Sequence, residues 1–314
     1  MLDYLILGAG AVGSLVGGRL ARAGHRVQLV NRSPATRQAI AAAGGLRLHL
    51  DDGEHLVPVD AATPQEAQPA RHVIVLTKTP QSEAAVASVA SRMPNDAVWL
   101  SLQNGLGNGA RLQAWLGEKS VVLQGVTMLP ADLKAPGEVA SHGKSTTWLG
   151  PMHAAHMAAA ERVAADLSGA GVDAQAVAQV SDHIWQKAVF NCAMNALCAL
   201  TQGGPGLMAD CPDGAALAHE LVDEVGAVAL ATGARVDVSA VHALVDMGMQ
   251  HHRYHKPSML QDVLADRLTE IDALNGFVHA QAQSLGLAPP KNHMMLRLMR
   301  LREQAPTFWA SQTA

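Results

Sequence analysis

Aromatic residues are scarce in this sequence, where five Trp, two Tyr and three Phe make up 3% of 314 residues. Without large rings the core must be filled by Ala, Val, Leu and Met, a composition that favours helices over β-sandwiches. Charge is sparse as well, at 16% of residues, and 23 Lys and Arg against 27 Asp and Glu leave a net charge of −4. Because no basic block occurs, the chain is a poor candidate for binding nucleic acid or an anionic membrane.

The sequence contains only three cysteines, and their spacing argues against a local disulfide and against a C-x-x-C zinc or redox site. Cys192 and Cys198 are six positions apart on an expected helix, so their side chains diverge, and no C-x-x-C pair exists. No run of about 18 apolar residues occurs, and the apolar stretch Tyr4–Leu7 meets glycines without a basic leader. We therefore expect a cytoplasmic protein with reduced thiols and no membrane contact.

What the sequence has is enough apolar residues, 49%, to fill the cores of about two domains. Short apolar strands alternate with helices in the first half, a pattern typical of a parallel sheet covered on both faces. From Ser181 onward strand signals fade, and long helical patterns are separated by breaks at Gly203-Gly204-Pro205-Gly206, Lys256-Pro257 and Pro289-Pro290. We predict an α/β protein: a Rossmann-like, doubly wound sheet over residues 1–179 and an all-α domain over residues 180–314. The predicted elements of the first domain are strands Tyr4–Leu7, Arg26–Val30, Val73–Leu76, Val98–Leu102 and Val121–Gln124, a hairpin of Leu46–Leu50 and His55–Val59, and helices Ala11–Ala23 and Gln81–Met93.

A glycine-rich motif follows the first predicted strand. Its residues are Gly8, Ala9, Gly10, Ala11, Val12 and Gly13, which fit G-x-G-x-x-G. In such a loop the first glycine permits the turn, the second admits a pyrophosphate and the third allows close helix–strand packing. The alternative is a tight strand–helix turn without a ligand. The position between a buried strand and a helix favours a dinucleotide site.

The end of the second strand indicates which dinucleotide is bound. An NAD-binding domain usually places Asp or Glu there for the ribose 2′-hydroxyl. This segment contains no acid and carries Arg32 instead. Because a guanidinium can pair with a 2′-phosphate, the sequence predicts NADPH, with Arg32 as an ordinary surface residue the alternative. Residues 1–179 would then form an NADP-binding domain and residues 180–314 a substrate and catalytic domain.

Two more polar residues end predicted parallel strands, where open α/β sheets bind ligands. Lys78 follows Val73–Thr77, and Asn104 lies in Gln103-Asn104-Gly105. Lys78 could contact a phosphate or be an exposed lysine. Asn104 could bind a ligand or serve turn chemistry, and spacing does not decide between these.

A polar stripe crosses an otherwise apolar helix predicted from Ile184 to Leu200. Lys187, Asn191 and Asn195 stand at i, i+4 and i+8, on one face along about 12 Å of helix. Burying an ammonium and two amides is costly unless they meet partners or a ligand. The stripe is therefore either a hydrogen-bonded structural feature or the wall of a polar pocket in which Lys187 acts as an acid.

Two candidates near the C-terminal end have structural explanations of their own. Pro257 can open a helix that carries Ser258, and Thr269 with Asp272 resembles a weak capping box. Glu270 would then lie at a helix N-terminus, where a negative charge is favourable. Considered alone, both Ser258 and Glu270 fit structural roles.

Taken together, the motifs resemble the ketopantoate reductase (2-dehydropantoate 2-reductase) family, which has a 6-phosphogluconate dehydrogenase-like fold. The matching pieces, in order, are the glycine loop, Arg32, Leu76-Thr77-Lys78, Gln103-Asn104-Gly105, the segment from Lys187 to Asn195, Ser258-Met259-Leu260-Gln261-Asp262 and Thr269-Glu270-Ile271-Asp272. The resemblance implies an oxidoreductase of CH–OH groups that reduces 2-dehydropantoate to pantoate with NADPH, in pantothenate and coenzyme A biosynthesis.

The resemblance also implies residue roles. Lys187 and Glu270 would be the catalytic residues, and Lys187 would donate a proton to the substrate carbonyl oxygen. Asn191, Asn195 and Ser258 would bind the keto acid together with Lys187. Asn104 would contact both ligands. The residues that would contact NADPH or order its site are the glycine loop, Arg32, Lys78, Ala131 and Glu270.

Departures from the family pattern leave the identity of the keto acid open. Ala196, Cys198 and Pro205 replace residues usual in the family, and Asp266 replaces a glycine. The alternatives are a paralogue that reduces another 2-oxo acid, and a non-catalytic NADPH-binding sensor. We expect a monomer or homodimer with a small-molecule substrate. We expect no metal, because His251 and His255 have no evident third ligand.

Overall fold

The computed structural model describes residues 1–312, which divide into two compact units. The first unit contains residues 1–103 and 108–180, and the second contains residues 104–107 and 181–312. The main chain thus enters the second unit twice, first as the short loop Asn104–Gly107. Sequence patterning predicted one boundary near residue 179 and gave no sign of this early excursion.

The first unit contains a sheet of eight described strands. Their spatial order is β12 (Ala174–Ala176), β11 (Thr147–Pro151), β8 (Val121–Thr127), β7 (Val98–Ser101), β6 (Ala70–Val75), β1 (Leu2–Leu7), β2 (Val27–Val30) and β5 (Asp60–Ala62). All neighbouring pairs are parallel except β8 and β11. Strand β1 lies between β2 and β6, so the chain leaves it in opposite directions across the sheet, which is the doubly wound arrangement predicted from the sequence.

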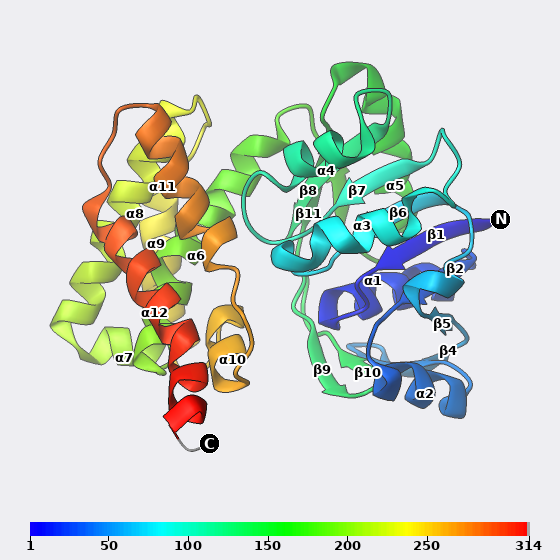
Figure 1. Cartoon of the computed structure of the whole chain (residues 1–314), viewed down its shortest axis with the longest axis horizontal. Helices are drawn as coiled ribbons and strands as arrows, with labels where there is room; N and C mark the ends of the chain where they lie inside the picture. Colours follow the sequence, from blue (N-terminus) through cyan, green and yellow to red (C-terminus); the bar gives the residue numbers. More distant parts are fainter. Residues whose placement is uncertain (313–314) are drawn as a thin grey trace. The chain divides into compact units, whose positions relative to one another are not determined.

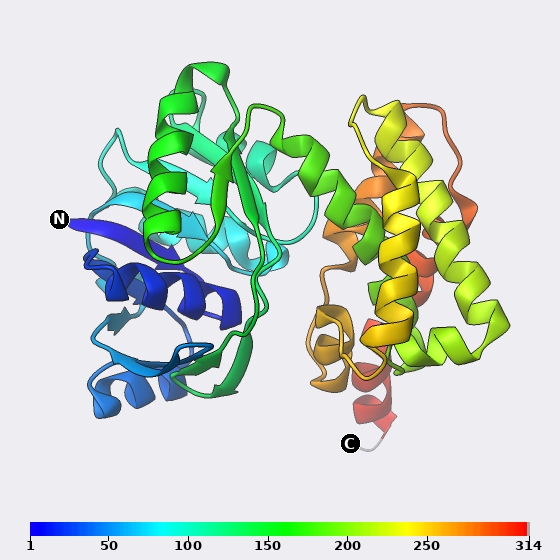
Figure 2. The same cartoon turned by 180° about the vertical axis from the view of Figure 1, so that it is seen from behind.

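Helices cover both faces of this sheet because successive side chains of a strand point to opposite faces. Tyr4 and Ile6 belong to one apolar core, and Leu5 and Leu7 belong to another. Figures 1 and 2 show α3 and α4 on one side of the sheet and α1 and α5 on the other. The helices of this unit are α1 (Ala11–Arg22), α2 (Pro34–Ala43), α3 (Ser82–Ala90), α4 (Asn108–Leu116) and α5 (Met157–Gly169).

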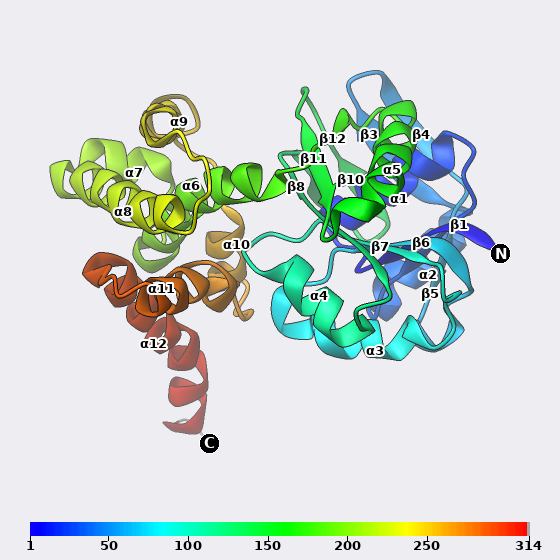
Figure 3. The same cartoon turned by 90° about the horizontal axis from the view of Figure 1, so that it is seen from above.

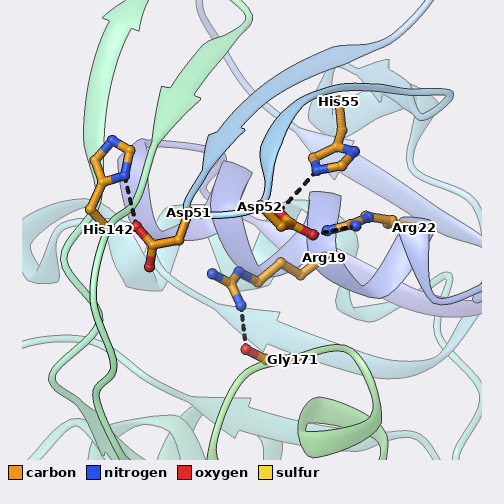
Figure 4. A network of polar contacts seen from close by, with 7 residues as sticks. All are labelled: Arg19, Arg22, Asp51, Asp52, His55, His142 and Gly171. Atoms are coloured by element: carbon orange, nitrogen blue, oxygen red, sulfur yellow. Dashed lines mark hydrogen bonds and ion pairs between the residues drawn. The ribbon is translucent and has the colours of Figure 1, made fainter.

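A second, smaller sheet is built around the predicted hairpin. Its order is β4 (Gly53–Val57), β3 (Leu46–Leu50), β10 (Glu138–Ala140) and β9 (Asp132–Ala135). The hairpin turn is held by its two aspartates, as Figure 4 shows: His142 Nδ1 lies 3.0 Å from Asp51, and Arg22 donates to Asp52 at 2.6 Å. The hydrogen bond from Arg22 lowers the pKa of Asp52 to about 2, so this carboxylate stays charged at neutral pH.

The second unit is helical throughout its described residues. Its helices are α6 (Val180–Thr201, which begins at the boundary), α7 (Pro205–Asp210), α8 (Pro212–Ala231), α9 (Val238–His251), α10 (Ser258–Leu264), α11 (Asn275–Ser284) and α12 (Pro290–Gln312). Breaks fall at the predicted Gly and Pro positions. Figure 3 shows α9 on one side of α8, and α11 and α12 on the other. The apolar residues of α6 lie in the core of this unit, from Ala188 to Ala199.

Helix α12 continues to Gln312. One local expectation was wrong. Thr269 does not cap a helix with Asp272; instead its hydroxyl donates to Glu303 at 2.6 Å, and only a short 3₁₀ turn, Ile271–Ala273, follows. The carboxylate of Asp272 pairs with Arg300. Contacts with α12, which is distant in sequence, thus replace the local capping pattern.

Candidate active site

The glycine loop joins β1 to α1 with the geometry that the motif predicts. Gly8 has φ +104°, and a Cβ there would lie 2.5 Å from the backbone nitrogen of Thr77. A Cβ on Gly13 would lie 2.2 Å from the Gly8 oxygen, so helix and loop pack closely only because neither residue has a side chain. A Cβ on Gly10 would meet no atom within 4 Å. The loop is therefore closely packed at Gly8 and Gly13, and it is open at Gly10, where a phosphate would approach.

Helix α1 begins without neutralising its N-terminal charge. Its N-cap, Gly10, has no side chain to accept a hydrogen bond, and its first turn contains no acidic residue. The backbone N–H groups there remain available to an anion, and the helix dipole favours one. Ala11 and Val12 lie at this helix start. A dinucleotide pyrophosphate fits these features.

Arg32 is exposed directly after β2. Its neighbour Asn31, which sequence reasoning did not single out, ties this segment to the glycine loop. The Asn31 amide donates to the Ala9 carbonyl at 2.6 Å, and its side-chain oxygen accepts from the Ser33 N–H at 2.8 Å. Arg37 is committed elsewhere, because it donates to the Asn31 carbonyl at 2.7 Å. Of the two arginines near the end of β2, Arg32 is therefore the one that is exposed to solvent.

The segment after β6 is braced by a second residue without a predicted role. Buried Gln103 donates to the Thr77 carbonyl and to Ser82 Oγ, both at 2.6 Å. These bonds support the turn that carries Lys78, which is partly buried. Ala131 is also partly buried and packs against the core of the first unit. Lys78 and Ala131, both predicted to contact a dinucleotide, therefore lie on segments that are held by hydrogen bonds or by packing against the core.

We expect Gly8→Ala to destabilise the first unit strongly. The added Cβ would combine a left-handed backbone with a backbone clash, for an expected loss of roughly 2–4 kcal/mol in the free energy of unfolding. The matched control is Gly24→Ala, since Gly24 has φ +97° but open space where its Cβ would lie. It should cost only about 1 kcal/mol. Urea denaturation of both variants measures the difference, and equal losses would contradict the packing explanation.

The polar stripe of the second unit lies on α6 as predicted. Asn191 is 8% exposed and Asn195 is 5% exposed, and neither amide hydrogen-bonds to another of the residues 1–312. Neither amide belongs to the buried polar atoms that lack a partner, so both keep some access to solvent although the residues are largely buried. The two side chains are therefore poised for a polar ligand rather than for holding the fold together.

Lys187 stands one turn before Asn191 and is partly buried. It donates from Nζ to Asn104 Oδ1 at 2.7 Å, across 83 positions of sequence. Burial of the ammonium lowers the pKa of Lys187 from 10.5 to about 8, while the charge of Glu270 partly opposes this shift. The structure thus brings together three predicted residues, Lys187, Asn104 and Glu270, around an amine that gives up its proton near neutral pH.

Ser258 is not joined to this group by the described contacts. It is the first residue of α10 and is exposed. The neighbouring motif residue Asp262 is buried and accepts from Arg267 at 3.1 Å. Asp266 has φ +48°, which explains why a glycine is usual there, and aspartate is one of the residues that tolerates this conformation. These contacts shape the turn after α10.

A buried asparagine pair supports the stripe from behind and escaped the sequence analysis. Asn275 and Asn292 are both fully buried. Asn275 donates to the carbonyl of Cys192, in α6 between the two stripe asparagines, at 3.2 Å and to Asn292 Oδ1 at 3.0 Å. Asn275 is the first residue of α11, and no local pattern signals its burial. The pair ties α11 and α12 to the backbone of α6.

The three departures from the family pattern on the helical side are buried. Ala196 and Cys198 lie fully within the core of the second unit, and Pro205 is the buried first residue of α7. Burial raises the pKa of the Cys198 thiol to about 12, so it stays protonated.

Residues 1–312 hold no group of three or more His, Cys, Asp or Glu arranged as a metal site. Within the same residues, no helix is both long and apolar enough to cross a membrane.

Residues 4–154 match the family profile described as ketopantoate reductase PanE/ApbA, and residues 179–303 match that of its C-terminal part. The chain belongs to the ketopantoate reductase family. It is therefore a member of a family of oxidoreductases, as the sequence resemblance indicated. A 2-dehydropantoate 2-reductase of Pyrococcus horikoshii is 30% identical over 302 residues, covering 96% of this chain and 98% of the relative.

Solved structures of similar proteins include two enzymes that are named for different substrates. A PanE/ApbA family ketopantoate reductase from Ralstonia eutropha is 33% identical, with a TM-score of 0.87 over 97% of this chain and 99% of that one. A D-mandelate dehydrogenase, solved with NADH and anilino(oxo)acetate, is 27% identical, with a TM-score of 0.89 over the same shares of the two chains. The fold therefore serves proteins named for different substrates and, in the second case, solved with NADH.

Proposed function

We propose that this ketopantoate reductase family member reduces 2-dehydropantoate to pantoate with NADPH, the reaction of pantothenate and coenzyme A biosynthesis. The observation that carries the proposal is Lys187, with its lowered pKa of about 8, on the same face of α6 as the largely buried amides of Asn191 and Asn195. The curated relative named 2-dehydropantoate 2-reductase supports the choice of substrate.

A nicotinamide dinucleotide fits the first unit on three counts: the open side of Gly10, the uncapped start of α1 and the absence of acid after β2. The glycine loop, Lys78 and Ala131 would hold it, and Arg32 would pair with a 2′-phosphate. When bound, NADPH supplies two electrons and one hydrogen to the carbonyl carbon of the substrate.

The residues of the second unit would complete the reaction. Lys187 would give its proton to the carbonyl oxygen as negative charge develops there, leaving a hydroxyl group on the product and a neutral amine on the enzyme. Asn104 Oδ1 holds the ammonium in place, and the Glu270 carboxylate opposes complete loss of its proton. Asn191, Asn195 and Ser258 would bind the carboxylate and hydroxyl groups of the keto acid.

A second candidate is reduction of a different 2-oxo acid, favoured by the structural similarity to D-mandelate dehydrogenase. The same Lys187 chemistry would serve it, and only the substrate side chain would differ. Absorbance at 340 nm distinguishes the two candidates when NADPH or NADH is mixed with ketopantoate or with a panel of other 2-oxo acids. We expect rapid oxidation of NADPH with ketopantoate. Turnover of another oxo acid alone would favour the second candidate, and tight NADPH binding without turnover would indicate a sensor.

A further inference from the structure

The backbone of the loop Asn104–Gly107 contacts the helical part of the second unit at Ala273. The N–H of Leu106 donates to the Ala273 carbonyl at 2.8 Å, and the Leu106 side chain is 2% exposed within the helical core. Ala273 is the last residue of the 3₁₀ turn that follows Glu270. Its N–H donates to the Glu270 carbonyl at 3.0 Å. The loop that presents Asn104 therefore rests on the turn that presents Glu270.

Gly105 is the residue that allows this close approach. Its φ is +90°, and a Cβ there would lie 2.8 Å from the Ala273 oxygen and 2.9 Å from the Ala273 Cβ. Both atoms belong to the backbone or to a side chain without rotatable bonds, so neither can move aside cheaply. Any other residue at position 105 would lift the loop away from the turn.

We propose that Gly105 is a positioning residue: its bare backbone seats the loop against Ala273 and so holds Asn104 Oδ1 on the Nζ of Lys187. The inference rests on the proposed function for its effect on turnover, but the contact itself concerns only residues of the second unit. Gly105 touches no reacting group. It acts through Asn104, its neighbour in the chain.

The consequence for Lys187 has a definite sign. An oxygen that accepts from the ammonium stabilises the charged form of the lysine. Withdrawing Asn104 while the amine stays buried removes that stabilisation, so the pKa of Lys187 should fall below its present value of about 8. A smaller fraction of Lys187 would then be protonated at neutral pH, and without Asn104 the ammonium would no longer be held in place.

The test is a double-mutant cycle with Gly105→Ala and Asn104→Ala in the full chain. Competitive acetylation over a pH series, with mass spectrometry of the Lys187 peptide, measures the pKa of Lys187 without any need for activity. The kcat for the best 2-oxo acid at neutral pH is the second readout. The matched control is Gly117→Ala, because Gly117 has φ +88° but open space at its Cβ position.

We expect Gly105→Ala to lower the pKa of Lys187 and to reduce kcat on the order of 10- to 100-fold, while Gly117→Ala changes neither. In the Asn104→Ala background, Gly105→Ala should have little further effect on either quantity. If Gly105→Ala fails to fold, as judged by circular dichroism, the Gly105→Ala/Ala273→Gly variant removes one of the two crowding atoms. It should fold and show an intermediate lowering.

An unchanged pKa in a folded Gly105→Ala variant would overturn the inference, as would equal effects with and without Asn104. The proposed function fails by a different result, since a wild-type protein that reduces no 2-oxo acid still reports the pKa of Lys187. The acetylation cycle would then support or overturn the positioning role by itself.

Discussion

Replacing Lys187 by Met is expected to lower kcat for 2-oxo acid reduction by about 10²–10⁴-fold, the usual contribution of a positioned general acid. The same substitution should stabilise the folded protein. Burial holds the pKa of Lys187 at about 8 rather than 10.5, so at pH 7 the folded state keeps a desolvated ammonium at a cost of roughly 3 kcal/mol. Methionine fills similar volume without that cost.

The pH dependence follows from the direction of the same shift. Below about pH 8 both folded and unfolded chains protonate Lys187, so the full cost is present; it disappears as pH rises toward 10.5, where both forms become neutral. The stabilisation by Lys187→Met should therefore be largest at neutral pH and smallest above 10.5. Reduction by the wild-type protein should be flat below about pH 8 and fall at higher pH, because the acid must hold its proton.

Stopped-flow assays and urea denaturation at several pH values check these expectations. Lys119→Met is the matched control, since Lys119 is exposed in the first unit and should change neither quantity. Near-normal turnover by Lys187→Met would remove this residue from the proton transfer. A variant that is both inactive and less stable would instead indicate that Lys187 serves the fold.

The second large effect is expected for cofactor preference, on replacing Arg32 by Asp. Asn31 holds this segment against the glycine loop, so side chains at position 32 are presented beside the loop that would bind the dinucleotide. An aspartate there would repel a 2′-phosphate and accept from a 2′-hydroxyl. The ratio of kcat/KM for NADPH over NADH should fall on the order of 10²–10³-fold.

Initial rates with each cofactor at a saturating concentration of the 2-oxo acid measure this ratio. Arg162→Asp provides the control, because Arg162 is an exposed arginine on α5 and the substitution changes net charge equally. A preference that Arg32→Asp leaves intact would exclude the 2′-phosphate contact. It would also favour an NADH-linked protein, the cofactor with which the similar D-mandelate dehydrogenase was solved.

Local signals predicted the parts of the fold that depend on neighbouring residues. The glycine spacing identified the β1–α1 turn, apolar runs identified the central strands, and Gly and Pro clusters identified the helix ends in the second unit. Strands such as β9 and β12 escaped prediction. Strand β9 is exposed along its whole length and β12 has three residues, so neither has an apolar pattern, and pairing alone makes them strands.

The candidate site divides in the same way. Helical periodicity alone put Lys187, Asn191 and Asn195 on one face of α6, because i and i+4 spacing is a local property. Asn104 and Glu270 were named as candidates, but their closeness to Lys187 spans 83 positions in each direction along the chain. No local pattern predicts a contact across that separation.

The sequence by itself determined the dinucleotide-type loop, the alternation of strand and helix, and the polar stripe on α6. Only the tertiary structure decided how Lys187 ionises. Desolvation by the packed helices lowers its pKa and the Glu270 charge raises it. Asn104, from a third part of the chain, accepts a hydrogen bond from its Nζ. Electrostatic and solvation effects act through space, so they become defined only when folding brings those groups together.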